Sequence, residues 1–544
     1  MKILLVNPKS PQDNGRDLYT APIAGPLFAF QPFTKMGFGL PLALPTLAAH
    51  TPSKHQVEII DEEVEQIDFN IKYDLVGITA MTYKAPRAYK LAKAFMKTGA
   101  KVVMGGIHAS MCPDEASEYF DSVVIGEAEK IWPKMLEDCQ NNNLKKFYKE
   151  DEFPDIKTSL PPRYDLVKNR HYVCTCLQTT RGCPYNCSFC TVTKHNGHKL
   201  RKKSINQVIE EIDSIIKLKK TYGLIHNKRD NQTRKFKGIF GFADDNFTID
   251  RQHAVAVCQA IKKYQDDNNI YFSWFTQVNS SVGFDNELLE LMAESNCNYL
   301  LIGFESLEPE SLKSMKKKMN SPQDYSMIIK NIHDKGIRVI YSTIFDDNSI
   351  KREAIDSLIV FINKTKVLHV LTNILTPYPG TDLREKMKSK GLISSNDHSL
   401  FNIRNLVYKP KGISKKGFYT NYLKINDELF SFDKIISRSN ELCKSQQNLS
   451  FPILARIPLF LGFIGTSLLL CLRGKLKPSI LLKLIHLSPS RLLGSGNLSE
   501  MELLAIAADH DDYKDKEERR IKGLFPLFEL EMLFSLILCD IDII

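Results

Sequence analysis

The sequence predicts an α/β protein with a doubly wound, Rossmann-like parallel sheet, then a partial (β/α)6 barrel, then a mostly helical C-terminal region. Short β-rich runs alternate with helical patterns over residues 1–150, and the alternation recurs six times over 173–395. From 396 to 544 the pattern changes to long apolar and basic runs. Residues 151–172 are proline-rich and aperiodic, which is typical of a linker. At 544 residues the chain is long enough for several such domains.

In the first domain, ligands are expected at the carboxyl ends of the strands, as in other sheets of this kind. Thr79 and Met81 stand at one such end, and Gly105 and Gly106 at another; paired glycines let a ligand approach the backbone closely. His108 is expected to be a loop histidine bonded to a backbone carbonyl. The expected strands are 2–8, 55–63, 73–81, 100–106 and 120–129.

In the second domain, the reactive face of a β/α barrel lies at the carboxyl ends of its strands. Asp244, Asp245 and Glu305 fall at that end, together with the sequence TPYPGT of residues 376–381. Residues 222–237 are polar and basic and predict a surface insertion. The expected strands are 173–180, 237–249, 270–279, 297–306, 337–345 and 367–380.

Three cysteines stand close together in TTRGCPYNCSFCTV, residues 179–192, just after the first expected barrel strand. Cys183, Cys187 and Cys190 follow at intervals of four and three. A structural zinc site closes with four protein ligands, and the usual cubane iron–sulfur cluster also takes four thiolates. Three ligands therefore imply a distant fourth, as in a zinc knuckle, or an iron cluster with one open corner.

This CxxxCxxC arrangement, with Arg181-Gly182 before it and Phe189 within it, resembles the radical S-adenosylmethionine (SAM) enzymes. Over about residues 1–420 the chain is similar to the branch that carries a cobalamin-binding domain before the barrel. That branch includes hopanoid methylases and the anaerobic magnesium-protoporphyrin cyclase. The matching blocks are 105–133, 242–250, 301–318 and 376–393.

The resemblance implies roles for the residues that match. The three cysteines would hold a 4Fe-4S cluster whose fourth iron binds SAM. Glu305 would contact the ribose or amino group of SAM, or would form only a structural ion pair. Asp244 and Asp245 would orient the cofactor or cap the next helix. Pro379, Gly380 and Thr381 would shape the loop beneath the adenine or form only a tight turn.

The resemblance also implies cobalamin, although the chain lacks the Asp-x-His-x-x-Gly motif that supplies an axial histidine in many cobalamin proteins. Binding would then use Gly105, Gly106 and the loop at Thr79 and Met81; the alternative is a degenerate domain that no longer binds cobalamin. The favoured reaction is cobalamin-dependent methylation of an unactivated carbon in a hydrophobic or lipid-like substrate, with electrons from a donor such as flavodoxin or ferredoxin. The alternatives are oxidative cyclisation, carbon–carbon coupling without methyl transfer, and RNA modification.

The net charge of +10 has a local origin. Seven Lys or Arg and no acidic residues lie between Leu442 and Ser499, among apolar runs. Residues 451–493 therefore predict an interfacial membrane element, with a buried helical pair as the alternative. The longest uncharged run, 457–472, is shorter than a spanning helix.

The region is too poor in aromatic residues for nucleic-acid stacking. With no export signal, we expect a cytoplasmic enzyme, peripheral on the inner membrane face.

Overall fold

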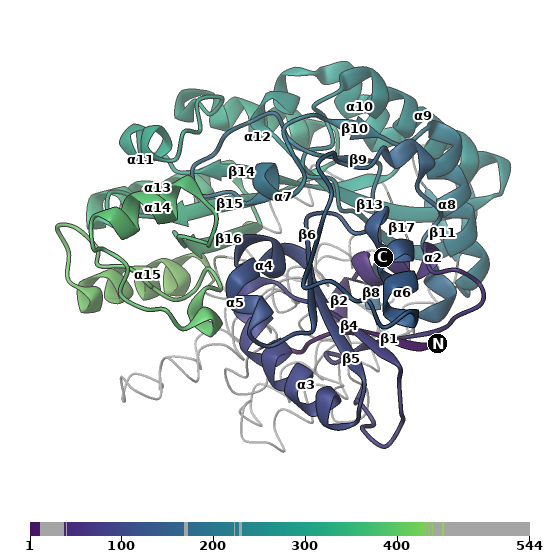
Figure 1. Ribbon diagram of the computed structural model, residues 1–544. Helices are drawn as coiled ribbons and strands as arrows, with labels where there is room; N and C mark the ends of the chain where they lie inside the picture. Colours follow the sequence, from purple (N-terminus) through teal and green to yellow (C-terminus); the bar gives the residue numbers. More distant parts are fainter. Residues whose placement is uncertain are drawn as a thin grey trace, which may run out of the picture.

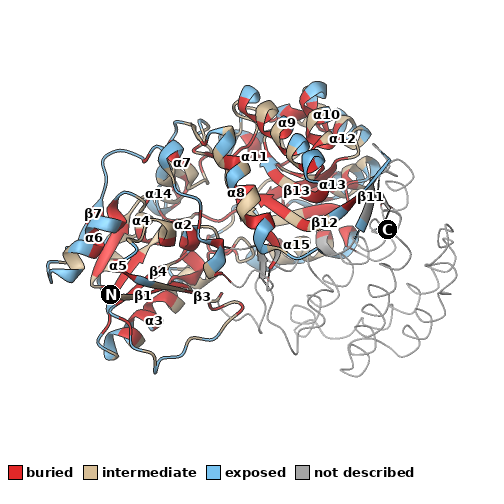
Figure 2. Ribbon diagram, turned by 90° about the vertical axis from the view of Figure 1, so that its right-hand side faces the viewer, coloured by how far each residue is buried: buried red, intermediate tan, exposed pale blue. Residues whose placement is uncertain are grey.

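The computed structural model describes residues 1–10, 37–39, 41–167, 172–221, 224–227 and 231–430, with 434, 438 and 449–450. Figure 1 shows an N-terminal lobe built on one sheet and a larger lobe built on a second sheet. In Figure 2 the two lobes lie side by side, and the buried residues follow the strands of both.

The N-terminal lobe contains a six-stranded, all-parallel sheet in the order β3-β1-β4-β5-β6-β7. The order reverses at β1, which creates the crevice where such sheets bind ligands. The five strands expected from the sequence are confirmed, and β7 is an addition. Their bounds are β1 Lys2–Asn7, β3 Gln56–Asp61, β4 Leu75–Thr79, β5 Lys101–Gly105, β6 Ser122–Ile125 and β7 Phe147–Lys149. The helices are α2 Ala43–Ala49, α3 Ala85–Lys97, α4 Gly106–Met111, α5 Pro113–Ser117 and α6 Ile131–Gln140.

Strand β1 shows why this sheet is buried on both faces. Its four central residues are all apolar and fully buried. Leu4 and Val6 belong to the core that includes residues of α3, and Ile3 and Leu5 to the core that includes Trp132 of α6. A strand of a doubly covered parallel sheet reads as one continuous apolar run for this reason.

The larger lobe contains six parallel strands in the order β8-β12-β13-β14-β15-β16, which confirms the predicted partial barrel. The strands are β8 Tyr172–Leu177, β12 Gln232–Phe242, β13 Ile270–Val278, β14 Cys297–Glu305, β15 Arg338–Phe345 and β16 His369–Ile374. The connecting helices are α8 Ile205–Leu218, α9 Arg251–Asp267, α10 Asn286–Glu294, α11 Pro309–Ser314, α12 Tyr325–Asp334 and α13 Arg352–Thr365. Helix α14 (Asp382–Ser389) follows β16.

Two features of this sheet differ from the expectation. The predicted surface insertion is wrong in part, because β11 (Leu224–Asn227) pairs antiparallel with the start of β12 and extends the sheet. Strand β2 (Gly37–Gly39), which precedes most of the N-terminal sheet in the sequence, pairs with β8 of the larger lobe. The chain therefore enters the larger lobe before it completes the first. The predicted domain limits stay a prediction.

The C-terminal region is described only in part. Helix α15 (Lys415–Leu429) packs on α13, in agreement with the predicted helical character. The predicted membrane-interfacial stretch 451–493 lies outside the described residues. Within the part of the chain that the structure describes, we find no helix both long and apolar enough to cross a bilayer.

Candidate active site

The structure brings the three motif cysteines together in the loop between β9 (Thr180–Arg181) and α7 (Val192–His195). All three are free thiols and half-buried. Burial raises the pKa of each, and that of Cys190 to about 12, with further contributions from the neighbouring thiols for Cys183 and Cys190. Such thiols ionise when a metal binds them. Three soft donors on one short loop therefore fit an iron–sulfur cluster with one open corner.

Backbone hydrogen bonds fix the loop between its cysteines. The amide of Ser188 donates to the Met315 carbonyl at 3.0 Å, and the Ser188 carbonyl accepts from the Leu383 amide at 2.9 Å. Met315 follows α11, and Leu383 lies in α14. The cysteine loop is thus held by elements that follow two other barrel strands.

Glu305 ends β14 in a conformation that few residues adopt. Its φ is +64°, in the left-handed region, and the pairing with β15 shifts register between Gly303 and Glu305. The side chain is almost fully buried, and a Cβ at position 303 would overlap its carboxylate. Such strain is concentrated at functional sites. The geometry therefore agrees with Glu305 as a site residue, although its contact with SAM stays a prediction.

Lys317 is a site residue that the sequence did not identify. Its Nζ lies 2.7 Å from Oε1 of Glu305, and both side chains are largely buried. Burial alone would lower the pKa of Lys317, but Glu305 and Cys187 outweigh it and raise that pKa. In turn, the charge of Lys317 opposes the rise in the pKa of the three thiols that burial causes. The only sequence signal was a run of three lysines at the end of the block 301–318 that contains Glu305.

Asp244 and Asp245 both hold the cysteine loop. Asp244 is fully buried and accepts four hydrogen bonds of 2.5–3.0 Å from the amides and hydroxyls of Thr179 and Thr180. Asp245 accepts from the Gly182 amide at 2.8 Å and from the Asn196 side chain. Burial raises the pKa of Asp244 to about 6 against the opposing effect of these bonds.

The alternative that these two aspartates cap the next helix is wrong. The N-cap of α9 is Asp250, whose side chain accepts from the His253 amide. A direct cofactor contact for Asp244 or Asp245 stays a prediction.

Replacing Asp244 by alanine is expected to lower both stability and iron content. Four buried donors would lose their acceptor, at a cost of about 3 kcal/mol or more in the free energy of unfolding. Asp250→Ala is the control, because it removes an N-cap worth about 1 kcal/mol and a partly exposed ion pair with Lys202, but none of the bonds to Thr179 and Thr180. Denaturant titration and iron analysis of both variants test this. Equal iron loss in the two variants would contradict the assigned role of Asp244.

The segment Pro379, Gly380 and Thr381 forms a tight turn before α14. The Thr381 hydroxyl donates to the Tyr378 carbonyl at 2.6 Å and accepts from the Arg384 amide, so it caps the helix. Gly380 lies directly against the Met111 side chain of α4. The turn therefore contacts the N-terminal lobe, and its predicted place beneath the adenine stays untested.

The predicted cobalamin residues lie together at the ends of two paired strands. Thr79 ends β4, Gly105 ends β5, and the two residues are register partners. Gly106 follows with a φ of +90°, and Met81 exposes 42% of its surface beside them. A Cβ on Gly106 would lie 2.5 Å from Thr79 Oγ1 and 3.3 Å from the Ala80 amide nitrogen. The two strand ends therefore pack closely at Gly106, with an exposed apolar side chain nearby, and their contact with cobalamin stays a prediction.

Replacing Gly106 by alanine is expected to reduce cobalamin retention at least tenfold, because the added Cβ would force the two strand ends apart. Gly99→Ala is the matched control: its φ is +88°, but a Cβ there meets no atom within 4 Å. Both variants carry the same backbone strain of about 1 kcal/mol. Cobalamin absorbance after gel filtration measures retention. If Gly99→Ala loses as much cobalamin, Gly106 is not part of the binding surface.

His108 differs from the expectation. It lies in α4, is fully buried, and its Nε2 is 2.7 Å from the Tyr89 hydroxyl of α3. The predicted loop position and carbonyl partner are therefore wrong. The contact with Tyr89 occupies one of the two ring nitrogens, and Nδ1 has no hydrogen-bond partner among the described residues.

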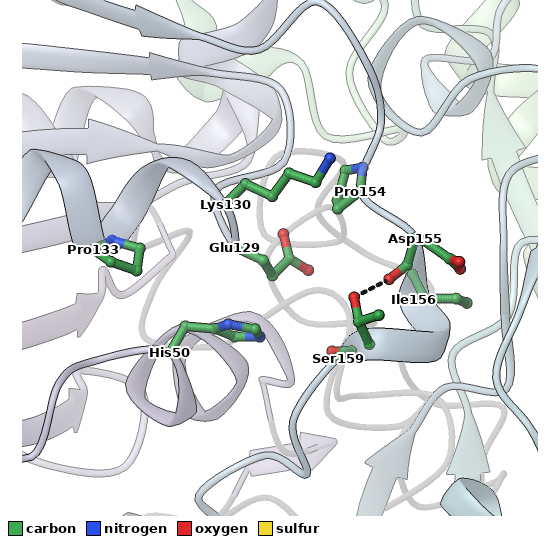
Figure 3. A pocket seen from close by; sticks show the side chains of 9 residues that line it. His50, Glu129, Lys130, Pro133, Pro154, Asp155, Ile156 and Ser159 are labelled. Carbon is green, nitrogen blue, oxygen red and sulfur yellow. Dashed lines mark hydrogen bonds between the residues drawn. The ribbon is translucent and has the colours of Figure 1, made fainter.

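A buried ion-pair network joins the cysteine loop to the N-terminal lobe. Arg181 pairs with Glu127 at 2.5 Å and Glu129 at 2.7 Å, and Arg201 also pairs with Glu127. Both glutamates follow β6. Beside this network, a pocket of about 250 Å³ opens between α2, the start of α6 and residues 154–159 (Figure 3). Its lining includes Glu129 and His50 but none of the predicted cofactor residues.

Comparison with known proteins shows the family to which the chain belongs. Residues 177–358 match the model of the radical SAM superfamily, and residues 37–135 match that of the B12 binding domain. The chain is 30% identical over 407 residues to bacteriochlorophyllide d C-8(2)-methyltransferase of Chlorobaculum tepidum, which covers 73% of this chain and 87% of that protein. It is 23% identical over 408 residues to hopanoid C-2 methylase of Rhodopseudomonas palustris, which covers 74% of this chain and 73% of that protein.

The fold agrees with these relatives. The solved structure of the radical SAM methyltransferase TsrM from Kitasatospora setae, with cobalamin and a 4Fe-4S cluster bound, superposes with a TM-score of 0.56 at 17% identity. The match covers 90% of this chain and 99% of that one. The cofactors of the family are therefore a 4Fe-4S cluster, SAM and cobalamin. The chain belongs to the cobalamin-dependent radical SAM enzymes and is a methyltransferase of that family.

Proposed function

We propose that this enzyme methylates an unactivated carbon of a hydrophobic, polycyclic or lipid-like substrate. The observation that carries the proposal is the contact between Gly380 and Met111, which joins the loop after the last barrel strand to the helix after β5. Each of these elements begins at the carboxyl end of a strand, where its lobe is expected to bind its cofactor. A substrate bound beside this contact would face both cofactors at once.

In this proposal, separate groups of residues bind the cluster, SAM and cobalamin. Cys183, Cys187 and Cys190 hold the cluster, while Glu305 and Lys317 place opposite charges beside it for the amino acid part of SAM. Thr79, Met81, Gly105 and Gly106 form the floor for cobalamin. When bound, the cluster and SAM supply the radical chemistry that removes a hydrogen atom, and cobalamin supplies the methyl group.

Asp244, Asp245 and Thr381 act on the position of the loops. The two aspartates hold the cysteine loop through Thr179, Thr180 and Gly182. The Thr381 cap starts α14, whose Leu383 amide bonds Ser188 in the same loop. These contacts fix the cysteine loop relative to the rest of the barrel, and group transfer depends on such fixed positions.

The relatives support the substrate class. The names of three of them give a bacteriochlorophyllide or a hopanoid, whereas a relative that matches only 30% of this chain is named for a cytidylyl phosphonate. We further propose a small one-electron donor protein such as a flavodoxin or ferredoxin, and a cytoplasmic enzyme that takes its substrate from a membrane surface.

The test uses the full-length protein, reconstituted anaerobically with iron, sulfide and cobalamin, and SAM labelled in its methyl group. Bacteriochlorophyllide d and a hopanoid serve as trial acceptors. A labelled product formed with equal amounts of S-adenosylhomocysteine and 5′-deoxyadenosine supports the proposal. An unlabelled product with 5′-deoxyadenosine alone would replace it with the oxidative or coupling reaction.

A further inference from the structure

Four metal-binding side chains converge outside the site described above. They are His108 of α4, Cys112 at the junction of α4 and α5, Glu115 of α5, and His398 in the short helical turn His398–Leu400. One ligand atom from each lies within 4.8 Å of all the others. Three of the residues belong to the N-terminal lobe, and His398 comes from the segment that follows the barrel.

The hydrogen bonds within this cluster leave two imidazole nitrogens unused. Glu115 accepts from the Tyr89 hydroxyl at 2.9 Å and lies 2.8 Å from Nε2 of His398, while Nε2 of His108 lies 2.7 Å from Tyr89. The Nδ1 atoms of both His108 and His398 are buried and have no hydrogen-bond partner among the described residues. A buried polar atom without a partner costs about 1–3 kcal/mol.

The donor set fits one class of ligand. Imidazole nitrogen, thiolate sulfur and carboxylate oxygen together are typical of zinc, and four protein ligands are typical of a structural zinc site. Zinc–ligand bonds of about 2.0–2.3 Å place ligands roughly 3.3–3.8 Å apart, so closure requires shifts on the order of 1 Å.

We propose that His108, Cys112, Glu115 and His398 form a structural zinc site. Bound zinc would tie the segment at 398 to α4, the helix that starts at Gly106 and ends at Met111. The site would therefore hold the floor for cobalamin and the surface that meets Gly380 in one arrangement. It is separate from the cysteine loop at 183–190, which supplies other ligands.

The test measures zinc and iron in the same full-length, anaerobically reconstituted protein after zinc addition and gel filtration. We expect one zinc per chain in the native protein, with the iron content of a filled cluster. Cys112→Ser and His398→Ala should each reduce zinc at least fivefold and leave iron unchanged. Cys139→Ser is the control, since Cys139 is also a half-buried free thiol but lies in α6, outside the cluster.

Zinc X-ray absorption identifies the ligands. A first shell with one sulfur and otherwise nitrogen or oxygen supports the proposal. If both variants retain their zinc, or if zinc increases only as iron falls, the zinc belongs to another site and the proposal is wrong. The proposal is also wrong if the native protein does not bind stoichiometric zinc, because the four side chains then form a hydrogen-bonded network only.

Discussion

Replacing Cys187 by serine is expected to abolish the cluster and, with it, all turnover. The serine hydroxyl does not replace a thiolate on iron, and two remaining thiolates do not hold a cubane. Reconstituted native protein should carry about four irons per chain and show the broad charge-transfer absorption of the cluster. The variant should show neither, and its activity should fall by at least about 10⁶-fold, the lower limit of typical enzymatic acceleration.

The control for this variant is again Cys139→Ser, which changes a thiol of similar exposure in the other lobe. It should bind the full amount of iron and keep its activity. Elemental analysis and electron paramagnetic resonance of the reduced protein provide the measurement. A normal cluster in Cys187→Ser would mean that the three motif cysteines are not the ligand set.

The second large effect is expected at the ion pair between Glu305 and Lys317. Lys317→Met leaves a buried carboxylate without its cation, and Glu305→Gln leaves a buried ammonium without its anion. Breaking a buried pair in this way costs about 3–5 kcal/mol. The double variant should cost less than the sum of the two, since neither charge is then left alone.

Lys316 offers a matched control one residue away. It pairs with Asp382 at 2.8 Å, but both side chains are more than one-third exposed, and such pairs are worth about 1 kcal/mol or less. Denaturant titration followed by the fluorescence of Trp274, which is buried in the barrel, measures the differences. SAM titration of the reduced cluster should separately show weaker binding in both single variants. If Lys317→Met lowers the free energy of unfolding no more than Lys316→Met does, Lys317 is not part of the site.

The fold could be predicted largely because its strands are buried on both faces. Runs such as the apolar core of β1 show this burial directly in the sequence. The missed elements lack that signal: β7 is three residues long and pairs on one side only, and β11 is four residues long and pairs with the polar residues 232–235 of β12. Pairing across the sheet, and not local composition, determines these strands.

The site could be predicted where one short motif contains it, as for the three cysteines. Glu305 was identified through its similarity to the family, but its partner Lys317 depends on how the chain turns after α11. The contacts of Asp244 with Thr179 and Thr180 span 64–65 residues, and that of Glu115 with His398 spans 283. No local pattern encodes such distances, so the loop anchors and the four-residue cluster emerged only from the fold.

The ion pairs of Arg181 and Arg201 with Glu127 limit how this enzyme could be taken apart or recombined. A fragment that begins at 173 would contain both arginines without their carboxylates and would expose the edge of β8 that β2 now covers. The lobes are therefore not interchangeable modules. A chimaera with a relative's cobalamin lobe should fold only if that lobe supplies its own acidic pair after β6 and its own strand to pair with β8. Substitution of one lobe therefore requires that the contacts between the lobes be kept, wherever in the linker the two sequences are joined.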